Sequence, residues 1–380
     1  MDFGFSAEQD MLRQIARSFL AENCPTSFVR QMMEDERGYQ PDLWKAMADL
    51  GWLGLAFPEA YGGQGLGFVD LTVILEEMGA VLLPSPFLSS VLLAGQTILL
   101  GGSEAQKSLY LPRIADGSLL ATLALTEPSG RFDAAGVMDV QAVPTADGFS
   151  LSGTKLFVPD AHVAELLIVA ARTKESGDKS YGISLFLVDA SSTGLSTTLL
   201  KTMDQTRKQC EVVLDNVTVG RDRLIGGLDM GWPVLQKVLN IATAALCAEM
   251  VGSAQRVLDI SVAYAKERVQ FGRPIGSFQA IKHKCAEMML QVESAKSAAY
   301  YAAWAVDEDV PEAPLAVSMA KAYCSDAYRF TAGEGIQVHG GIGFTWEHDM
   351  HLYFKRAKNC EFTFGDATYH RELVAQEIHL

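Results

Sequence analysis

The sequence predicts an α+β protein with an N-terminal helical domain, 1–120, a small central β-barrel domain, 121–228, and a C-terminal four-helix-bundle domain, 229–380. Its 380 residues exceed the size at which one hydrophobic core usually stops growing, so more than one domain is expected. The spacing of apolar residues is helical at both ends of the chain and alternating in the middle, which predicts strands between two helical regions. With 49% hydrophobic and 20% charged residues, the chain has the composition of a well-packed globular protein.

The N-terminal region has the pattern of amphipathic helices. Ser6 followed by Glu8 and Gln9 is typical of a helix start, and Met11 and Ile15 follow at helical spacing. Further helices are expected over 41–50, 68–78 and 87–100.

The middle region has the pattern of short strands bounded by turns. The pair Asp147-Gly148 is typical of a tight hairpin turn. Several strands at this spacing indicate a small barrel or sandwich. The candidate strands cover 121–126, 137–143, 149–157, 166–171, 183–188 and 210–219.

The C-terminal region is helical again. Long helices with Ala-rich faces are expected over 234–268, 278–306 and 314–335. Long antiparallel helices with few polar interruptions predict a bundle that keeps surface for subunit contacts.

Charge and composition exclude several classes of function. The formal net charge of −15 disfavours nucleic acid or an anionic membrane as the main partner, although a local group of cations can still bind an anionic small molecule. No apolar run reaches the roughly 18 residues of a membrane-spanning helix. The start, MDFGFSAEQD, lacks the basic and apolar regions of a secretion signal, and the six cysteines form no CxxC pair. We therefore expect a cytoplasmic protein with reduced thiols and no nucleic-acid or membrane partner.

The segment KERVQFGRPIGSFQAIKHK, 266–284, groups a cation, an aromatic ring and an amide at a junction between two helices. Arg268 could pair with a phosphate, Phe271 could contact a ring, and Gln279 could bind a polar edge. The segment taken alone is more typical of a solvated basic turn than of a ligand site.

A second junction follows in IQVHGGIGFTWEHDMH, 336–351. Gln337 closes a helix, and Gly340-Gly341 allows a ligand or another chain to approach the backbone closely. The histidines of this stretch are irregularly spaced and lack partner acids, so no metal site is expected.

Five motifs together resemble the acyl-CoA dehydrogenase family in order and approximate spacing: FPEAYGGQGLG, LTEPSG, GTKLF, RVQFGRPIGSFQ and QVHGGIGF. The resemblance covers essentially the whole chain and implies this family's helix–barrel–helix fold. It implies an FAD flavoprotein, usually a tetramer, that converts an acyl-CoA to the enoyl-CoA and passes electrons to an electron-transferring flavoprotein.

The resemblance also assigns roles to single residues. The cofactor-binding positions that it implies are Thr126, Arg268, Phe271, Gln279, Gln337, Gly341 and Asp366, with Gly365 beside the substrate. In the family, the set from Arg268 to Gly341 reaches FAD that is bound mainly by the adjacent subunit.

The positions of the catalytic base depart from the family. The commonest position of its glutamate, directly before a glycine, is Phe364 here, and the position used by a second lineage is Ala242. Asp366 remains as a weak candidate for a displaced base. The stretch after GTK, where the family places a hydroxyl-bearing WIT or WIS element, reads Leu156-Phe157-Val158 and lacks that hydroxyl. The residues that would reach the FAD of a neighbouring subunit, from Arg268 to Gly341, are therefore kept. The base and the hydroxyl that would serve this chain's own active site are missing.

Three hypotheses follow from this asymmetry. The chain is the base-lacking subunit of a heteromeric acyl-CoA dehydrogenase whose homologous partner supplies the glutamate. Alternatively, it is a self-sufficient homotetramer that uses Asp366, or a non-enzymatic acyl-CoA-binding homologue. The identity of the acyl group does not follow from the sequence.

Overall fold

The structure is a computed structural model that describes residues 6–380. The expectation of no secretion signal rests partly on residues 1–5, which lie outside the described residues. The chain forms two compact units. The first contains the described residues up to Gln31 together with Gly67–Leu83 and Thr243–Leu380, and the second contains Met32–Leu66 and Pro84–Ala242. The domain bounds 1–120, 121–228 and 229–380 stay a prediction.

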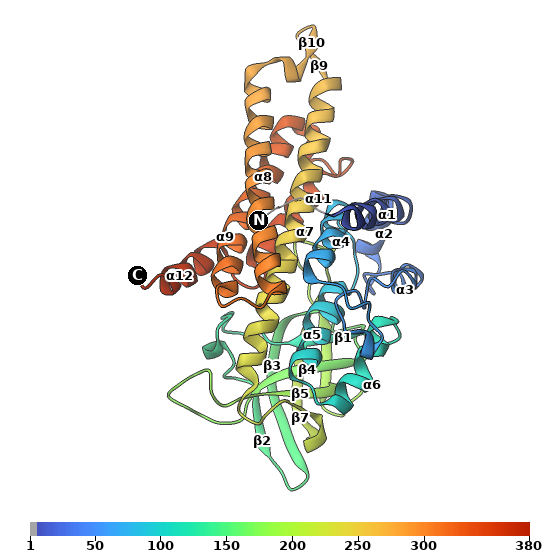
Figure 1. Ribbon diagram of the computed structural model, residues 1–380. Helices are drawn as coiled ribbons and strands as arrows, with labels where there is room; N and C mark the ends of the chain where they lie inside the picture. Colours follow the sequence, from blue (N-terminus) through green and yellow to red (C-terminus); the bar gives the residue numbers. More distant parts are fainter. Residues whose placement is uncertain (1–5) are drawn as a thin grey trace. The chain divides into compact units, whose positions relative to one another are not determined.

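The first unit is helical (Figure 1). Its N-terminal helix begins with a capping box, because the Ser6 hydroxyl accepts from the Gln9 amide and the Gln9 side chain accepts from the Ser6 amide. The helices of this unit are α1 (Ala7–Asn23), most of α2 (Thr26–Glu34), α4 (Phe68–Ala80), most of α7 (Gly231–Glu267), α8 (Gln279–Asp307), α9 (Ala313–His339), α10 (Gly341–Phe344), α11 (Met350–Phe362) and α12 (Ala367–Glu377).

Helices α4 and α7 cross at two glycines. A Cβ atom on Gly79 would lie 2.1 Å from the carbonyl oxygen of Glu249, and one on Gly252 would lie 1.9 Å from that of Glu76. The Ser253 hydroxyl also donates to the Gly79 carbonyl at 2.8 Å. Any larger residue at either glycine would separate the two helices.

Helix α7 is long and apolar enough, by length and composition alone, to cross a membrane. However, 61% of its most apolar window is buried inside the protein, as in the core helix of a globular protein. We therefore interpret α7 as a core helix.

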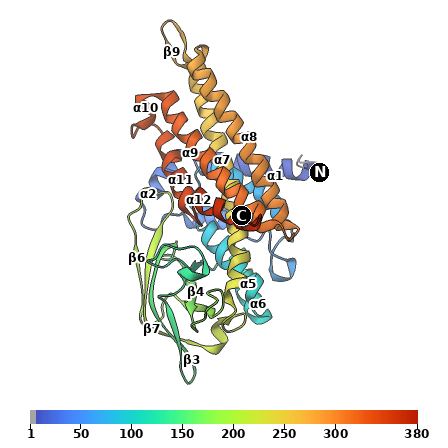
Figure 2. The same cartoon turned by 90° about the vertical axis from the view of Figure 1, so that its left-hand side faces the viewer.

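Helices α7 and α8 are joined at one end of the first unit by residues 268–278, which we call the α7–α8 connection. It consists of the two-stranded hairpin β9 (Val269–Gln270) and β10 (Arg273–Pro274), followed by a 3₁₀ turn, Ile275–Ser277. Helix α8 then returns beside α7 and packs along α9, as Figures 1 and 2 show.

The second unit is built on an eight-stranded sheet in the order β6-β7-β3-β2-β4-β5-β8, with β1 paired parallel to β4. The turn predicted at Asp147-Gly148 joins the antiparallel strands β2 and β3. The strands are β1 (Ala121–Ala124), β2 (Gln141–Pro144), β3 (Gly148–Pro159), β4 (Leu166–Arg172), β5 (Ile183–Asp189), β6 (Leu195–Leu199), β7 (Gln209–Gly220) and β8 (Leu224–Ile225).

A buried ion pair explains why β2 begins later than the sequence predicted. The Glu127 carboxylate accepts from the amides of residues 138, 139 and 140, so these groups do not join the sheet. The fully buried Lys155 ammonium donates to Glu127 at 2.7 Å and to the Leu125 carbonyl at 3.0 Å. The prediction of a strand over 137–143 was therefore wrong in its first half.

The second unit also contains helices, and one of them is bonded to the sheet. The helix predicted over 87–100 is a π-helix, Phe87–Gly95, followed by α5 (Gln96–Gly101). Its Ser90 hydroxyl donates to the Ala121 carbonyl and accepts from the Ala121 amide, which ties it to β1. The remaining helices are α3 (Pro41–Asp49) and α6 (Glu104–Ala115), with the first turns of α7.

Candidate functional site

The α7–α8 connection presents its side chains to solvent. Arg268 is exposed, and its backbone is fixed by bonds from its amide to the Tyr264 carbonyl and from the Ile275 amide to its own carbonyl, both 2.8 Å. Phe271 is 92% exposed and has a φ of +53°, a conformation rare for an aromatic residue. Its ring meets that of Phe278 edge-on, with 6.1 Å between ring centroids, but most of its surface is left to solvent. It is therefore a candidate for contact with a ligand or another subunit.

The same end of the unit carries two side-chain amides and two open glycines. Gln279 is the first residue of α8, and Gln337 lies in the last turn of α9, both exposed. A Cβ atom built on Gly340 or Gly341 would meet no heavy atom within 4 Å. The backbone there is open to close approach by another molecule.

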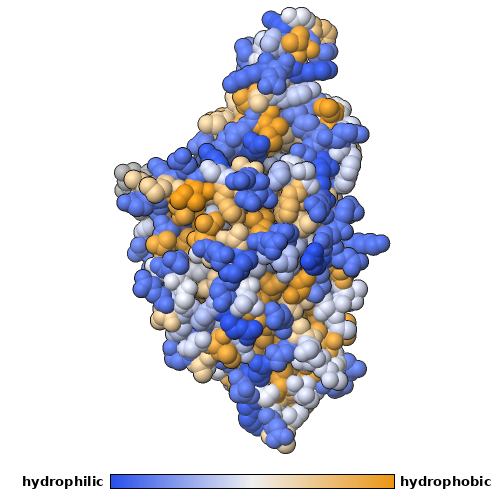
Figure 3. All heavy atoms as spheres, turned by 90° about the vertical axis from the view of Figure 1, so that its right-hand side faces the viewer, coloured by the Kyte–Doolittle hydropathy of each residue, from blue (hydrophilic) through white to orange (hydrophobic). Residues whose placement is uncertain are grey.

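The two groups are connected through the ring of His339. It stacks on Tyr264 of α7 with 4.3 Å between ring centroids, so the end of α9 is held against the last turns of α7. The projecting end in Figure 3 is mostly hydrophilic with isolated hydrophobic spheres. Guanidinium, exposed ring, amides and bare glycine backbone together suit a phosphate-bearing ligand that contains rings.

Thr126 belongs to the second unit and lies two residues after the end of β1. It is half-buried, and its carbonyl accepts from the Leu156 amide at 2.8 Å. Gly130, in the same loop, has no heavy atom within 4 Å of a built Cβ. The second unit thus keeps an open backbone at this loop, whereas the hydroxyl expected after GTK is replaced by the buried Val158.

Neither base position carries an acid in the structure. Phe364 is half-buried with a φ of +61°, and the buried Gly365 follows with a φ of +103°. A Cβ on Gly365 would lie 2.3 Å from the Tyr369 ring, so only glycine fits there. Ala242 is fully buried in α7.

The acids near these positions are engaged elsewhere. The Asp366 carboxylate caps α12 by accepting from the Tyr369 amide at 2.8 Å. Glu361 pairs with Lys358 at 2.5 Å. Glu249 pairs with the buried Arg356 at 2.5 Å.

Two buried side chains, a lysine and a histidine, hold the backbone around Phe364, and sequence reasoning missed both. The Lys321 ammonium donates to the carbonyls of Glu361 (3.0 Å) and Gly365 (2.7 Å), and to the Ser325 hydroxyl (3.0 Å). Nε2 of His370 donates to the Phe364 carbonyl at 3.0 Å. Burial, with a smaller effect of the Lys321 charge, lowers the pKa of His370 to about 4. The only signal in the sequence was a lysine on an otherwise apolar face of α9.

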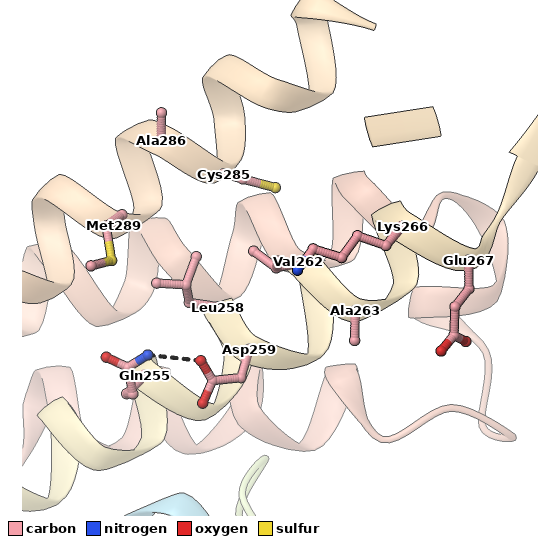
Figure 4. A pocket seen from close by; sticks show the side chains of 10 residues that line it. All are labelled: Gln255, Leu258, Asp259, Val262, Ala263, Lys266, Glu267, Cys285, Ala286 and Met289. Carbon is pink, nitrogen blue, oxygen red and sulfur yellow. Dashed lines mark hydrogen bonds between the residues drawn. The ribbon is translucent and has the colours of Figure 1, made fainter. Parts of the chain in front are cut away.

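A groove of about 660 Å³ runs between α7 and α8 (Figure 4). Gln255 Nε2 donates to Asp259 Oδ1 at 2.8 Å on its wall. None of the cofactor-binding residues inferred from the sequence lines it. The lining residues are Gln255, Leu258, Asp259, Val262, Ala263, Lys266, Glu267, Cys285, Ala286 and Met289. Among the described residues, no group of three or more His, Cys, Asp or Glu side chains is arranged to hold a metal ion.

The sequence matches three family models along nearly its whole length. These are "Acyl-CoA dehydrogenase, N-terminal domain" over residues 6–118, "middle domain" over 122–217 and "C-terminal domain" over 229–379. The chain belongs to the acyl-CoA dehydrogenase family. The predicted fold class, with helical, β-barrel and helical domains, is confirmed.

Individual relatives agree with this assignment. The chain is 31% identical to the probable acyl-CoA dehydrogenase YngJ of Bacillus subtilis, with 100% of each chain covered. It is 32% identical to the caffeyl-CoA reductase-Etf complex subunit CarC of Acetobacterium woodii, with 96% of each covered. Among solved structures, the ChsE4-ChsE5 complex from Mycobacterium tuberculosis contains a chain with a TM-score of 0.90 and 30% identity, covering 100% of this chain and 99% of that one.

Family membership makes the protein an FAD-dependent oxidoreductase that acts on acyl-CoA compounds. The residues at the end of the first unit fit this cofactor, since FAD carries a pyrophosphate for Arg268 and rings for Phe271. The unhindered backbone at Gly341 adds room for close approach.

Proposed function

We propose that this chain is the subunit without a catalytic base in a heteromeric acyl-CoA dehydrogenase that oxidises an acyl-CoA to the enoyl-CoA. The observation that carries the proposal is the contrast between two sets of residues. Phe364 and Ala242 stand where the family has its base, whereas Arg268, Phe271 and Gln279 are retained and exposed. A homologous partner subunit then supplies the glutamate.

Oxidation of an acyl-CoA needs a carboxylate for the α-proton and bound FAD as the acceptor of hydride. This chain contributes binding rather than proton transfer. Arg268 pairs with the pyrophosphate of the partner's cofactor, Phe271 contacts its rings, and Gln279, Gln337 and the Gly341 backbone hold its polar groups.

The self-sufficient alternative with Asp366 as the base has less support. Its carboxylate already accepts the Tyr369 amide at the start of α12, which fixes it in a structural bond. An aspartate two residues beyond the usual position also places its oxygens several ångströms away from the usual ones, and proton transfer tolerates little displacement.

Two relatives support a role in an assembly. The ChsE4-ChsE5 structure is a complex of two differently named chains, and CarC is named as a subunit of a complex with Etf. We include in the proposal a tetramer of two chain types, transfer of electrons to an electron-transferring flavoprotein, and a cytoplasmic location.

The deciding experiment is co-expression with a homologous dehydrogenase encoded beside this chain, with FAD counted per chain and turnover measured with a ferrocenium acceptor. We expect the co-purified complex to bind FAD and turn over, and the chain alone to be slower by about 10² to 10⁴-fold, the usual contribution of a positioned base. Robust turnover by the chain purified alone would contradict the proposal.

A further inference from the structure

Three stacked aromatic rings adjoin the open glycines Gly340 and Gly341, because the central ring belongs to His339, the residue before them. The His339 ring is buried, with 5% exposed, between Tyr264 of α7 at 4.3 Å and His348 at 4.5 Å, measured between ring centroids. His339 is the last residue of α9, and the glycine turn and α10 follow it at once. The position of α10 relative to α7 therefore depends on this stack.

A second layer of rings and cations adjoins the first. Trp346 stacks on His351 with 4.8 Å between ring centroids. The Lys355 ammonium lies 4.8 Å from the Trp346 ring centroid, and the Arg30 guanidinium carbon lies 5.4 Å from it. The Arg30 guanidinium also donates to the His348 carbonyl and to Asp349.

The surroundings of these imidazoles favour neutral rings. His339 Nδ1 donates to the Gly335 carbonyl at 2.7 Å, and Nε2 is buried with no hydrogen-bond partner among the described residues, so a second proton on Nε2 would have no acceptor there. His348 Nδ1 accepts from the Met350 amide at 3.1 Å, and a proton there would break this bond at the start of α11. His351 Nε2 is likewise buried and has no hydrogen-bond partner within residues 6–380.

The charges that face the cluster come from every neighbouring element. Arg30 of α2 and Lys355 of α11 are the cations, and Asp349 and Glu347 in the loop before α11 are the anions. Burial is the largest cause that lowers the pKa of His339, His348 and His351 below 6.5. The Lys355 and Arg30 charges add to this effect at His351. At His348, in contrast, the Asp349 charge offsets it more than the Arg30 charge adds to it.

We propose that His339 is a positioning residue, which holds the Gly340-Gly341 turn and α10 in place for the cofactor of the partner subunit and does so only as a neutral ring. The role toward the cofactor rests on the function proposed above. Protonation of His339 would place a charge against Tyr264 and His348, in a site with no acceptor for the new N–H. The stack then opens, and the end of α9, with the glycine turn that follows it, leaves α7.

The sign of the pH effect follows from the lowered pKa values. The native arrangement favours the neutral rings, so it is fully held above pH 6.5, the ordinary pKa of histidine. It is lost as the pH falls below that value through the lower pKa values of the folded cluster.

The test uses three variants. His339→Phe keeps a stacking ring but cannot take a proton, and His339→Ala removes the stack. His283→Phe, at an exposed position on α8, is the matched control. Amide hydrogen exchange of residues 340–349 is measured in the chain alone at about pH 7.5 and about pH 5, with correction for intrinsic exchange rates.

We expect protection of residues 340–349 to fall at least about tenfold at the lower pH in the native chain and in His283→Phe, but not in His339→Phe. His339→Ala should lack protection at both pH values. An equal loss in native and His339→Phe chains, or full protection in His339→Ala with a normal circular dichroism spectrum, would overturn the proposal.

A second measurement separates this proposal from the proposed function. FAD content of the co-purified complex is followed over the same pH range, and we expect it to fall with protection in the native complex and to persist in His339→Phe. If protection falls while FAD content stays constant, His339 does not position the cofactor site. The proposed function, which Arg268→Ala tests, would be unaffected by that result.

Discussion

The Phe364 carbonyl oxygen accepts a hydrogen bond from His370 Nε2 at 3.0 Å. One residue later, the Gly365 carbonyl accepts from the Lys321 ammonium at 2.7 Å. The backbone at the family's base position is thus held by two buried side chains from α9 and α12, although the position itself carries no acid. Loss of the glutamate has not been accompanied by loss of the local structure.

The His370 contact predicts that acid destabilises the first unit. The pKa of buried His370 is lowered to about 4, whereas the unfolded chain titrates near 6.5. Because the unfolded state takes up the proton first, the contribution of His370 to stability is complete above pH 6.5 and is lost as the pH falls toward 4. The loss is on the order of 1–3 kcal/mol, measured by denaturant unfolding at several pH values.

The control for this prediction is His370→Gln, whose amide can still donate to the Phe364 carbonyl. It should unfold with a smaller decrease in stability between pH 6.5 and 4 than the native chain. If both proteins lose stability in parallel, the titrating group lies elsewhere.

Restoring the acid at position 364 should restore part of the missing chemistry. We expect Phe364→Glu to raise dehydrogenation of acyl-CoA above that of Phe364→Gln, which has the same shape but no basic oxygen. Both variants keep a non-glycine residue at a φ of +61°, so backbone strain is equal in the two. The measurement is ferrocenium-coupled turnover, and equal rates for the two variants would mean that position 364 no longer faces the substrate.

Asp366 offers a test between a structural and a catalytic carboxylate. As the N-cap of α12, it should be replaceable by asparagine within about 0.5 kcal/mol, whereas Asp366→Ala should cost about 1 kcal/mol of unfolding free energy. Turnover of the complex should be unchanged in Asp366→Asn. A complete loss of turnover with an unchanged flavin spectrum would instead identify Asp366 as the base.

The long helices and most strands were predictable because their apolar spacing is regular over many residues, as in α8 and α9. Two features were not. The start of β2 depends on the Glu127 carboxylate, which binds amides more than ten residues away in the chain. The π-helix Phe87–Gly95, FLSSVLLAG, is buried at all but one of its residues, so its sequence has no exposed face whose spacing would distinguish helix types.

The candidate site was predictable where its residues lie close together in the sequence. It was not predictable where a contact joins residues that are far apart in the sequence. The groups at Arg268, Phe271 and Gln279 stand in one short motif and lie at one end of the unit. The support from Lys321 joins residues that are 44 positions apart, and the stack of Tyr264 on His339 joins α7 to α9. Neither pair has a pattern in the sequence, because each depends on how the helices pack.

The strongest test of the proposed heteromer, in which this chain binds the partner's FAD and the partner supplies the base, concerns Arg268. Its exposed guanidinium can make two charge-assisted bonds to a pyrophosphate, and lysine cannot reproduce that geometry. If it binds the partner's FAD, Arg268→Ala should remove FAD from an active site whose own residues are unchanged. In mixed assemblies the loss of FAD should follow the fraction of mutant chains.

Two variants serve as controls. Arg268→Lys should lose less FAD than Arg268→Ala. Arg273→Ala, at the neighbouring exposed arginine of β10, should also keep more FAD than Arg268→Ala. Unchanged FAD content and turnover of the co-purified complex in Arg268→Ala would contradict the role of Arg268 toward the partner's FAD. It would also contradict the proposal that this chain contributes cofactor binding to the partner's active site.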